Sequence, residues 1–167
     1  GARRNKLSDF TNVNANGKIA MKLDDGDHLV RVRVFEEDHN VFLATRKGKC
    51  ICFPVSDVRV FASRNSTGVR GIRLADGDEV IAMSGLKHIK VEVAERDDYL
   101  KSVNASRRLV GGDYTDRDED KASDEALAAQ LEQELFQEMA AEEEFILTVT
   151  EDGFGKRSSA YGYRISK

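Results

Sequence analysis

Two basic side chains, Lys22 and Arg73, occupy the same position in a segment that occurs twice in the chain. Residues 17–30 recur at 68–81, an offset of 51, and each copy carries an Asp-Gly-Asp turn sequence. In both copies the basic residue faces opposite to the apolar residues beside it. Cations repeated in this way would meet nucleic-acid phosphates at regular intervals, without reading bases and with a steep dependence on salt.

Other basic residues gather at turns that the sequence predicts, where side chains reach outward. Taken singly, each is equally compatible with a solvated surface charge. As a set they favour phosphate contact, because the body of the chain is basic. These weaker candidates are Arg70, Arg64, Arg46, Lys47, Lys49, Lys156 and Arg157.

The net charge of -4 averages two unlike regions. Residues 113–144 hold 13 acidic against 2 basic side chains, a balance of -11. The remaining chain holds 24 basic against 17 acidic side chains, a balance of +7. A basic body that carries an acidic block is typical of a nucleic-acid-binding surface with an internal counter-charge.

Metal and redox chemistry find little support in the sequence. Cys50 and Cys52 lie two apart on a predicted strand and should share a face, and we interpret them as two buried, reduced thiols; a redox role is the alternative. No further ligands follow at zinc spacing. The acidic run at 116–120 fails as a calcium loop, because Lys121 stands where Gly is needed and Leu127 where Glu is needed. We therefore expect no metal site.

Catalytic patterns are also weak. His28, His39 and His88 lie in unrelated contexts, and no nucleophile–base arrangement accompanies them. Gly155-Lys156 suggests a phosphate loop, but the leading Gly and the following Ser or Thr are missing. We expect no catalytic residues in this chain.

Short strands with glycine turns should position the basic residues. We expect hairpins over about 18–35 and 72–83, each closed by Asp-Gly, and further strands at 41–45, 50–53 and 58–62. A repeat near 50 residues indicates stacked or radial β modules. The expected fold is all-β, built from such modules of about 50 residues; their arrangement as propeller-like blades is what the family resemblance given below implies.

A second repeat brackets an insertion. The strand–turn–strand at 41–53 recurs at about 145–157; Gly153 aligns with Gly48, which sets the offset at 105. One period of 51 leaves about 54 surplus residues, so we place an insertion at about 84–143, between blades. Residues 86–93 alternate weakly and could form a strand, 96–120 should be a solvated loop, and 158–167 should start a closing strand.

Within the insertion we expect an acidic amphipathic helix at about 123–141. Ser123 can cap it, and an apolar stripe recurs every fourth residue. Three roles stay open for this helix: the stripe covers a patch of the β body, the acidic block competes with DNA phosphate, or the helix docks another protein. The stripe residues are Leu127, Leu131, Leu135 and Met139, widened by Ala128 and Phe136.

The sequence Gly68-Val69-Arg70-Gly71-Ile72-Arg73-Leu74, followed by Gly77-Asp78, closely resembles the C-terminal domain of DNA gyrase A subunits. Lys18-Ile19-Ala20-Met21-Lys22-Leu23 and Asp152-Gly153-Phe154-Gly155-Lys156-Arg157 carry the same resemblance, which covers about 3–83 and 144–167. It implies a β-pinwheel whose basic rim wraps DNA. The family's Gln-Arg-Arg-Gly-Gly-Lys-Gly box has no counterpart here, which predicts that 1–167 is a partial pinwheel of middle blades.

The resemblance also implies a larger enzyme. Its expected partners are duplex DNA, the remainder of gyrase A and gyrase B, in an ATP-dependent bacterial topoisomerase that introduces negative supercoils. ATP and Mg²⁺ are implied for that parent and no cofactor for this segment. The apolar runs are too short to cross a membrane, so we expect a cytoplasmic protein, and the resemblance implies that it is associated with the nucleoid. The alternative is a propeller-like protein-interaction scaffold whose acidic helix docks a partner.

Overall fold

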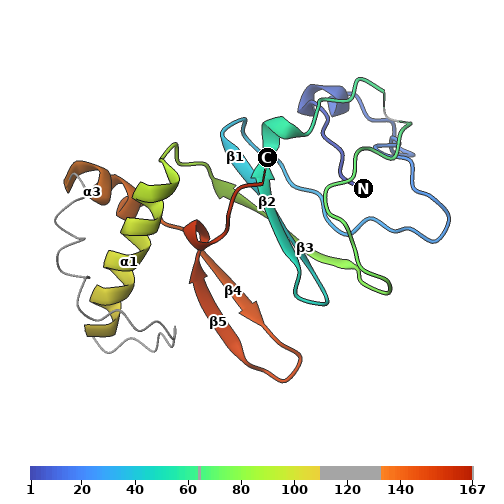
Figure 1. The fold of residues 1–167 in the computed structure, drawn as a ribbon. Coiled ribbons are helices and arrows are strands. Elements are labelled where there is room, and N and C mark those ends of the chain that lie inside the picture. Colours follow the sequence, from blue (N-terminus) through green and yellow to red (C-terminus); the bar gives the residue numbers. More distant parts are fainter. Residues whose placement is uncertain (64, 110–132, 167) are drawn as a thin grey trace. The chain divides into compact units, whose positions relative to one another are not determined.

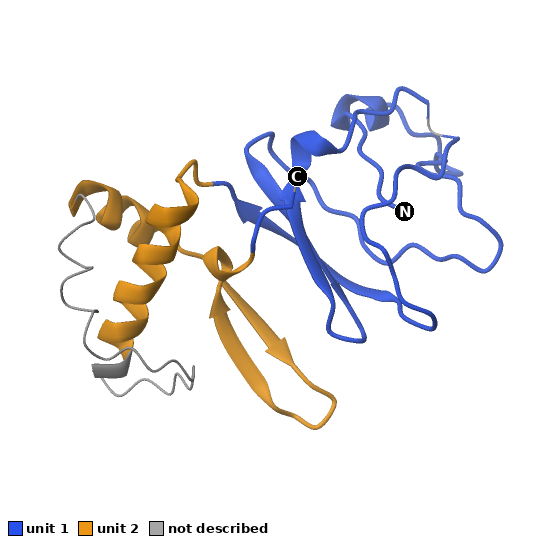
Figure 2. Ribbon diagram, viewed as in Figure 1, with its two compact units in different colours: residues 1–88, 164–167 blue, residues 89–163 orange. Residues whose placement is uncertain are grey.

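The computed structural model describes residues 1–63, 65–109 and 133–166, and its elements are mainly short antiparallel strands (Figure 1). Two compact units divide the chain: the first comprises 1–88 with 164–167, and the second comprises 89–163 (Figure 2). The elements are η1 (Leu7–Phe10), β1 (His39–Thr45), β2 (Cys50–Pro54), η2 (Val55–Asp57), β3 (Val80–Lys87), α1 (Val93–Leu109), α3 (Gln133–Glu142), β4 (Phe145–Val149), β5 (Gly155–Ser159) and η3 (Ala160–Gly162).

The first unit is built on a three-stranded antiparallel sheet with the order β2-β1-β3. A turn at Gly48, whose φ of 82° suits glycine, joins β1 to β2. Pro54 ends β2, one residue beyond the predicted strand at 50–53. The sheet buries an apolar cluster formed by Val41, Leu43, Phe53, Val55 and Val58.

The hairpin of β4 and β5 in the second unit repeats the hairpin of β1 and β2 at an offset of 105. Phe145 pairs with Ser159 where Asn40 pairs with Pro54, and the turn glycine Gly153 has a φ of 83°. A short 3-10 turn follows each hairpin, η2 in the first case and η3 in the second. The predicted 105-residue repeat is therefore confirmed in both strands and turns.

Strand pairing differs from the sequence prediction in three places. The hairpin expected at 18–35 is wrong: the chain turns at Asp25-Gly26, but no residue of that range is in a strand. β3 pairs with β1 and not with 72–74. The strand expected at 58–62 is reduced to one bridge, at Val60. A lone two-stranded ribbon is marginal in water, whereas pairing on β1 lets β3 bury Leu86.

Helix α1 replaces most of the solvated loop expected at 96–120; residues 110–120 lie outside the described ones. The strand considered at 86–93 ends with β3 at Lys87. The helix has a narrow apolar stripe of Tyr99, Leu100 and Val103, which packs into the core of the second unit. The many charged residues around this stripe make it hard to recognise in the sequence. The backbone N–H of Glu92 donates to the Glu95 carboxylate at 2.8 Å, which satisfies a free donor at the start of the helix.

Helix α3 is the described part of the predicted acidic helix and ends at Glu142, close to the predicted end at 141. The expected stripe residues Leu127, Ala128 and Leu131 lie outside the described residues. Met139 is fully buried against Tyr99 and Tyr161, and Leu135 and Phe136 pack beside it. The described part of the stripe therefore packs against α1 and η3 within its own unit.

A polar network ties α1 to the segment that enters β4. The Tyr99 hydroxyl donates to the Glu143 carboxylate at 3.1 Å, and Arg107 pairs with the same group at 2.6 Å. Burial, reinforced by Glu143, raises the pKa of Tyr99 far above its ordinary value. The hydroxyl stays protonated and donating across the physiological range.

Candidate nucleic-acid interface

The repeated cations Lys22 and Arg73 are both exposed in the first unit. The backbone N–H of Lys22 donates to the Ser66 carbonyl at 3.3 Å, and the Arg73 carbonyl accepts from Lys49 Nζ at 2.6 Å. The backbone at both positions is therefore held by hydrogen bonds while the side chains reach solvent. Such anchored, exposed cations can contact phosphate groups.

The basic turn between β1 and β2 uses its charges differently from the sequence prediction. Lys47 Nζ donates to the Asp76 carbonyl at 2.7 Å, and Arg46 pairs with Glu79 at 2.6 Å. With the Lys49 bond to Arg73, these contacts dock the turn onto residues 73–79. The three cations stay exposed, yet a nucleic acid would have to compete with the contacts that they already make.

Asp78 completes this docking. Its carboxylate accepts from the backbone N–H groups of Lys47 at 3.0 Å and Glu79 at 2.9 Å. Desolvation raises the pKa of Asp78, but these N–H groups, the Thr45 hydroxyl and the Lys47 charge outweigh it and hold the pKa below its ordinary value. The carboxylate is therefore ionised at neutral pH and supports the turn.

The remaining predicted cations are not part of the docked turn between β1 and β2. Arg70 is exposed in the first unit, and Arg64 lies outside the described residues. Lys156 and Arg157 are exposed on β5 of the second unit, where the Arg157 guanidinium lies 4.4 Å from the centre of the Phe145 ring. Arg107 stacks on the same ring at 5.0 Å.

Sequence reasoning overlooked two exposed arginines of the first unit, which lie outside its helices and strands. Arg31 and Arg33 alternate with Val32 and Val34, whose exposed fractions are 72% and 76%. The alternation of valine and arginine was the signal that could have found them. The stretch therefore exposes two cations together with two valine side chains.

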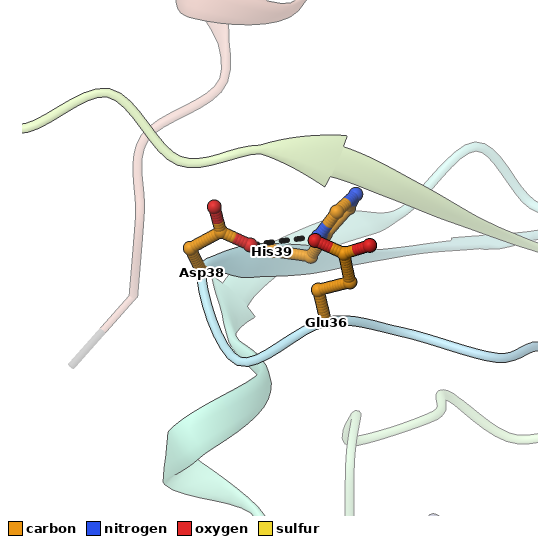
Figure 3. A group of neighbouring side chains, drawn as sticks. All are labelled: Glu36, Asp38 and His39. Carbon is orange, nitrogen blue, oxygen red and sulfur yellow. Dashed lines mark hydrogen bonds and ion pairs between the residues drawn. The ribbon is translucent and has the colours of Figure 1, made fainter.

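One carboxylate–imidazole group lies at the start of β1 (Figure 3). Glu36, Asp38 and His39 bring one potential ligand atom each within 4.8 Å of one another, and His39 Nδ1 lies 3.1 Å from Asp38 Oδ1. Both carboxylates are exposed to water. The dashed line in the figure marks the contact between Asp38 and the imidazole, and the His39 ring lies edge-on to Phe35 with 6.4 Å between the ring centroids.

The two cysteines are free thiols with different environments. Cys52 is buried, but Cys50 is exposed, so the expectation of two buried thiols is wrong for Cys50. Cys50 lies at the first position of β2, beside the solvent-facing turn. Burial and, to a smaller extent, the charge of the nearby Cys50 raise the pKa of Cys52 to about 11.

Among the described residues, no helix has the length and apolarity that crossing a membrane requires.

Comparison with known families supports the nucleic-acid reading. The family described as DNA gyrase C-terminal domain, beta-propeller, matches residues 2–36, 39–85 and 144–167. These ranges contain β1 and β2 and most of β3 in the first unit, and both strands of the second. The predicted all-β, propeller-like fold with an inserted acidic helix is confirmed, with α1 as an unforeseen addition.

Curated relatives cover the chain to different extents. The DNA gyrase A subunit of Granulibacter bethesdensis is 48% identical over 99% of this chain, and that of Rickettsia bellii is 52% identical over 98%. The corresponding protein of Escherichia coli is 40% identical over 81 residues, 48% of this chain. The chain spans 18% of the length of the first two relatives. Alignment with those two therefore extends through the inserted segment.

Proposed function

Because the chain belongs to the DNA gyrase C-terminal domain, beta-propeller family, we propose that it binds duplex DNA through its phosphates. The observation that carries this function is the exposed cation at one position of two successive repeats, Lys22 and Arg73. Contacts of this kind fix the position of a duplex but carry no sequence information. Binding is therefore indifferent to base sequence.

The charge distribution agrees with this function. Outside 113–144 the chain carries a balance of +7. Each phosphate that a cation neutralises releases condensed counterions, so affinity falls as salt rises. Arg70 and the alternating pair Arg31 and Arg33 add exposed positive charge within the first unit. The docked turn cations Arg46, Lys47 and Lys49 contribute less, because each already contacts protein groups.

In the longer protein, the chain would be part of a gyrase A subunit that works with gyrase B. We propose that these blades help to wrap DNA and so support ATP-dependent negative supercoiling in the bacterial cytoplasm, at the nucleoid. ATP and Mg²⁺ would serve that larger enzyme, and the strand-cleaving chemistry would belong to other parts of it. The share of 18% of the relatives' length is compatible with such a division of labour.

Fluorescence anisotropy of a mixed-sequence duplex across a salt series tests DNA binding. We expect log affinity to fall linearly with log salt, with a slope that corresponds to roughly four or more phosphates. A second duplex of unrelated sequence should bind equally well. Failure to bind either duplex at low salt would reject the function.

A second candidate is a protein-docking role for the inserted segment. The observation that favours it is the exposed acidic side of α3, which carries Glu134 and Glu138 while Met139 is buried beneath. An acidic helix surface on its own small core could receive a basic partner. Because the described apolar stripe is already covered, such docking would be electrostatic and sensitive to salt.

A further inference from the structure

Two arginines, Arg59 and Arg164, occupy equivalent positions in the structural repeat at offset 105. Each follows a β hairpin and a 3-10 turn, at the second residue after that turn. The turns close alike, because the Val58 N–H donates to the Val55 carbonyl and the Tyr163 N–H donates to the Ala160 carbonyl, both at 3.1 Å. Both arginines belong to the first unit, and both are exposed.

The backbone after each arginine is anchored in the same way. Val60 forms a parallel bridge with Arg4, and Ile165 forms one with Cys52. The next residue then donates its N–H: Phe61 to Arg4 at 2.9 Å, and Ser166 to Cys52 at 2.7 Å. The bridging residues are exposed to a similar degree, 40% for Val60 and 36% for Ile165. Because neighbouring side chains of an extended segment alternate, each arginine points away from its bridging neighbour.

The positive charge at this position is kept, whereas the charges of the hairpin turn reverse sign. Arg46 and Lys47 of the first hairpin correspond to Glu151 and Asp152 of the second. A solvated charge with no role has no reason to recur at one structural position while the charges of the preceding hairpin turn reverse sign. Arg59 and Arg164 are therefore a pair of repeated cations at an offset of 105, as Lys22 and Arg73 are at an offset of 51.

Neither guanidinium forms an ion pair with a carboxylate among the described residues. The Arg59 guanidinium lies 4.2 Å from the centre of the buried Phe61 ring, and Arg3 lies 4.8 Å from the same ring. Stacking restricts the rotamers of Arg59 and leaves the edge of its planar fork of N–H donors for an anion. A positioned guanidinium loses less entropy when it binds a phosphate.

We infer that Arg59 and Arg164 form a second repeated set of phosphate contacts, one after each hairpin, on the path of the bound duplex. This role rests on the DNA binding proposed above. The ligand at each position is a phosphodiester of the duplex backbone, held by charge-assisted hydrogen bonds from the guanidinium.

The test uses the double variant Arg59→Gln/Arg164→Gln in the anisotropy salt series. Loss of two phosphate contacts should lower the magnitude of the salt slope by about 1.8. The ratio of wild-type to variant affinity should then shrink by about 12-fold between 50 and 200 mM salt. Each single variant should lower the slope by about half as much as the double variant. The variant Arg59→Lys/Arg164→Lys should keep most of the wild-type slope, because lysine keeps the charge.

A matched control is Lys6→Gln/Lys90→Gln, which removes the same charge at two exposed lysines outside the repeated positions. Circular dichroism and thermal unfolding show whether each variant is folded. If the double variant does not fold, the salt series is measured on the two single variants. If the wild-type chain binds with a steep slope but the arginine variant matches this control, the inference on Arg59 and Arg164 fails while DNA binding stands. If the wild-type chain does not bind at all, the proposed function fails first.

Discussion

At the scale of single residues, the two thiols of β2 should differ sharply in reactivity. Iodoacetamide reacts with thiolates, and burial raises the pKa of Cys52 to about 11, whereas Cys50 is exposed. We expect intact mass spectrometry at pH 8 to show one rapid alkylation of the folded chain and a second only in denaturant. Replacement of Cys50 with serine should abolish the rapid event. Rapid double labelling of the folded chain would contradict the burial of Cys52.

The raised pKa of Cys52 also makes the free energy of unfolding depend on pH. A thiol whose pKa is higher in the folded chain than its ordinary value of 9.0 binds its proton more tightly when folded. Its contribution to stability is complete below pH 9.0 and is lost as pH rises towards about 11. The alkylation rate of Cys52 should rise over the same interval.

For the turn cations, the sequence predicted the exposure of the side chains but not their contacts, and for Cys50 it predicted burial wrongly. The turn cations are exposed, as predicted, but Lys47 and Lys49 bond to carbonyls at Asp76 and Arg73. Those partners are 29 and 24 residues away, so local sequence carried no sign of them. The sequence did not reveal Arg59 and Arg164 as a repeated pair, because the turns before them share a backbone structure but not their residue types.

At the scale of elements, the sequence predicted turns better than pairing. Gly26 and Gly77 adopt positive φ at the Asp-Gly turns, as expected from their sequence. Yet the arms of those turns do not pair with each other: the arm after Gly77 forms β3 and pairs with β1, and neither arm of the Gly26 turn is in a strand. Which strand pairs with which depends on the core that the whole sheet buries, and alternation within one hairpin does not encode it.

The packing of α3 on α1 gives a prediction at this scale. Met139 has no exposed surface and contacts the cluster of Tyr99 and Tyr161. Met139→Ala should destabilise the second unit by about 2–5 kcal/mol, because it leaves a cavity. Near-UV circular dichroism during urea unfolding reports on the tyrosines at this cavity.

Gln137→Ala on the exposed side of the same helix is the matched control. Alanine is the stronger helix former, so this control should change the unfolding midpoint little. Equal midpoints for Met139→Ala and Gln137→Ala would show that α3 does not close the core of the second unit.

At the scale of the whole molecule, repeats were the most informative feature of the sequence. Glycines that recur at fixed offsets take nearly the same conformation, as Gly48 and Gly153 do with φ of 82° and 83°. Turn glycines are constrained by backbone geometry, so the repeat remains visible even where strand residues have diverged. The inserted helices lack such markers, and α1 in particular depends on a stripe of few apolar residues.

The acidic insertion gives the prediction that concerns the whole chain. If its charge competes with DNA phosphate for the basic residues, Glu134→Gln/Glu138→Gln should tighten DNA binding. Both side chains are exposed on α3, so their loss leaves the core intact. A unit charge about 10 Å from a phosphate in water contributes about 0.4 kcal/mol, roughly twofold in affinity per charge before screening. Added salt should erase the difference.

The opposite change on the same helix provides the control. Gln133→Glu/Gln137→Glu adds two charges at exposed positions of α3 and should weaken DNA binding at low salt by a similar factor. Anisotropy titrations of the wild-type chain and both variants at 50 mM and 500 mM salt measure the effect. Opposite shifts at low salt that converge at high salt would show electrostatic competition. Identical affinities for all three chains at 50 mM would show that α3 acts too far from the DNA to regulate it, and protein docking would become the better role for the insertion.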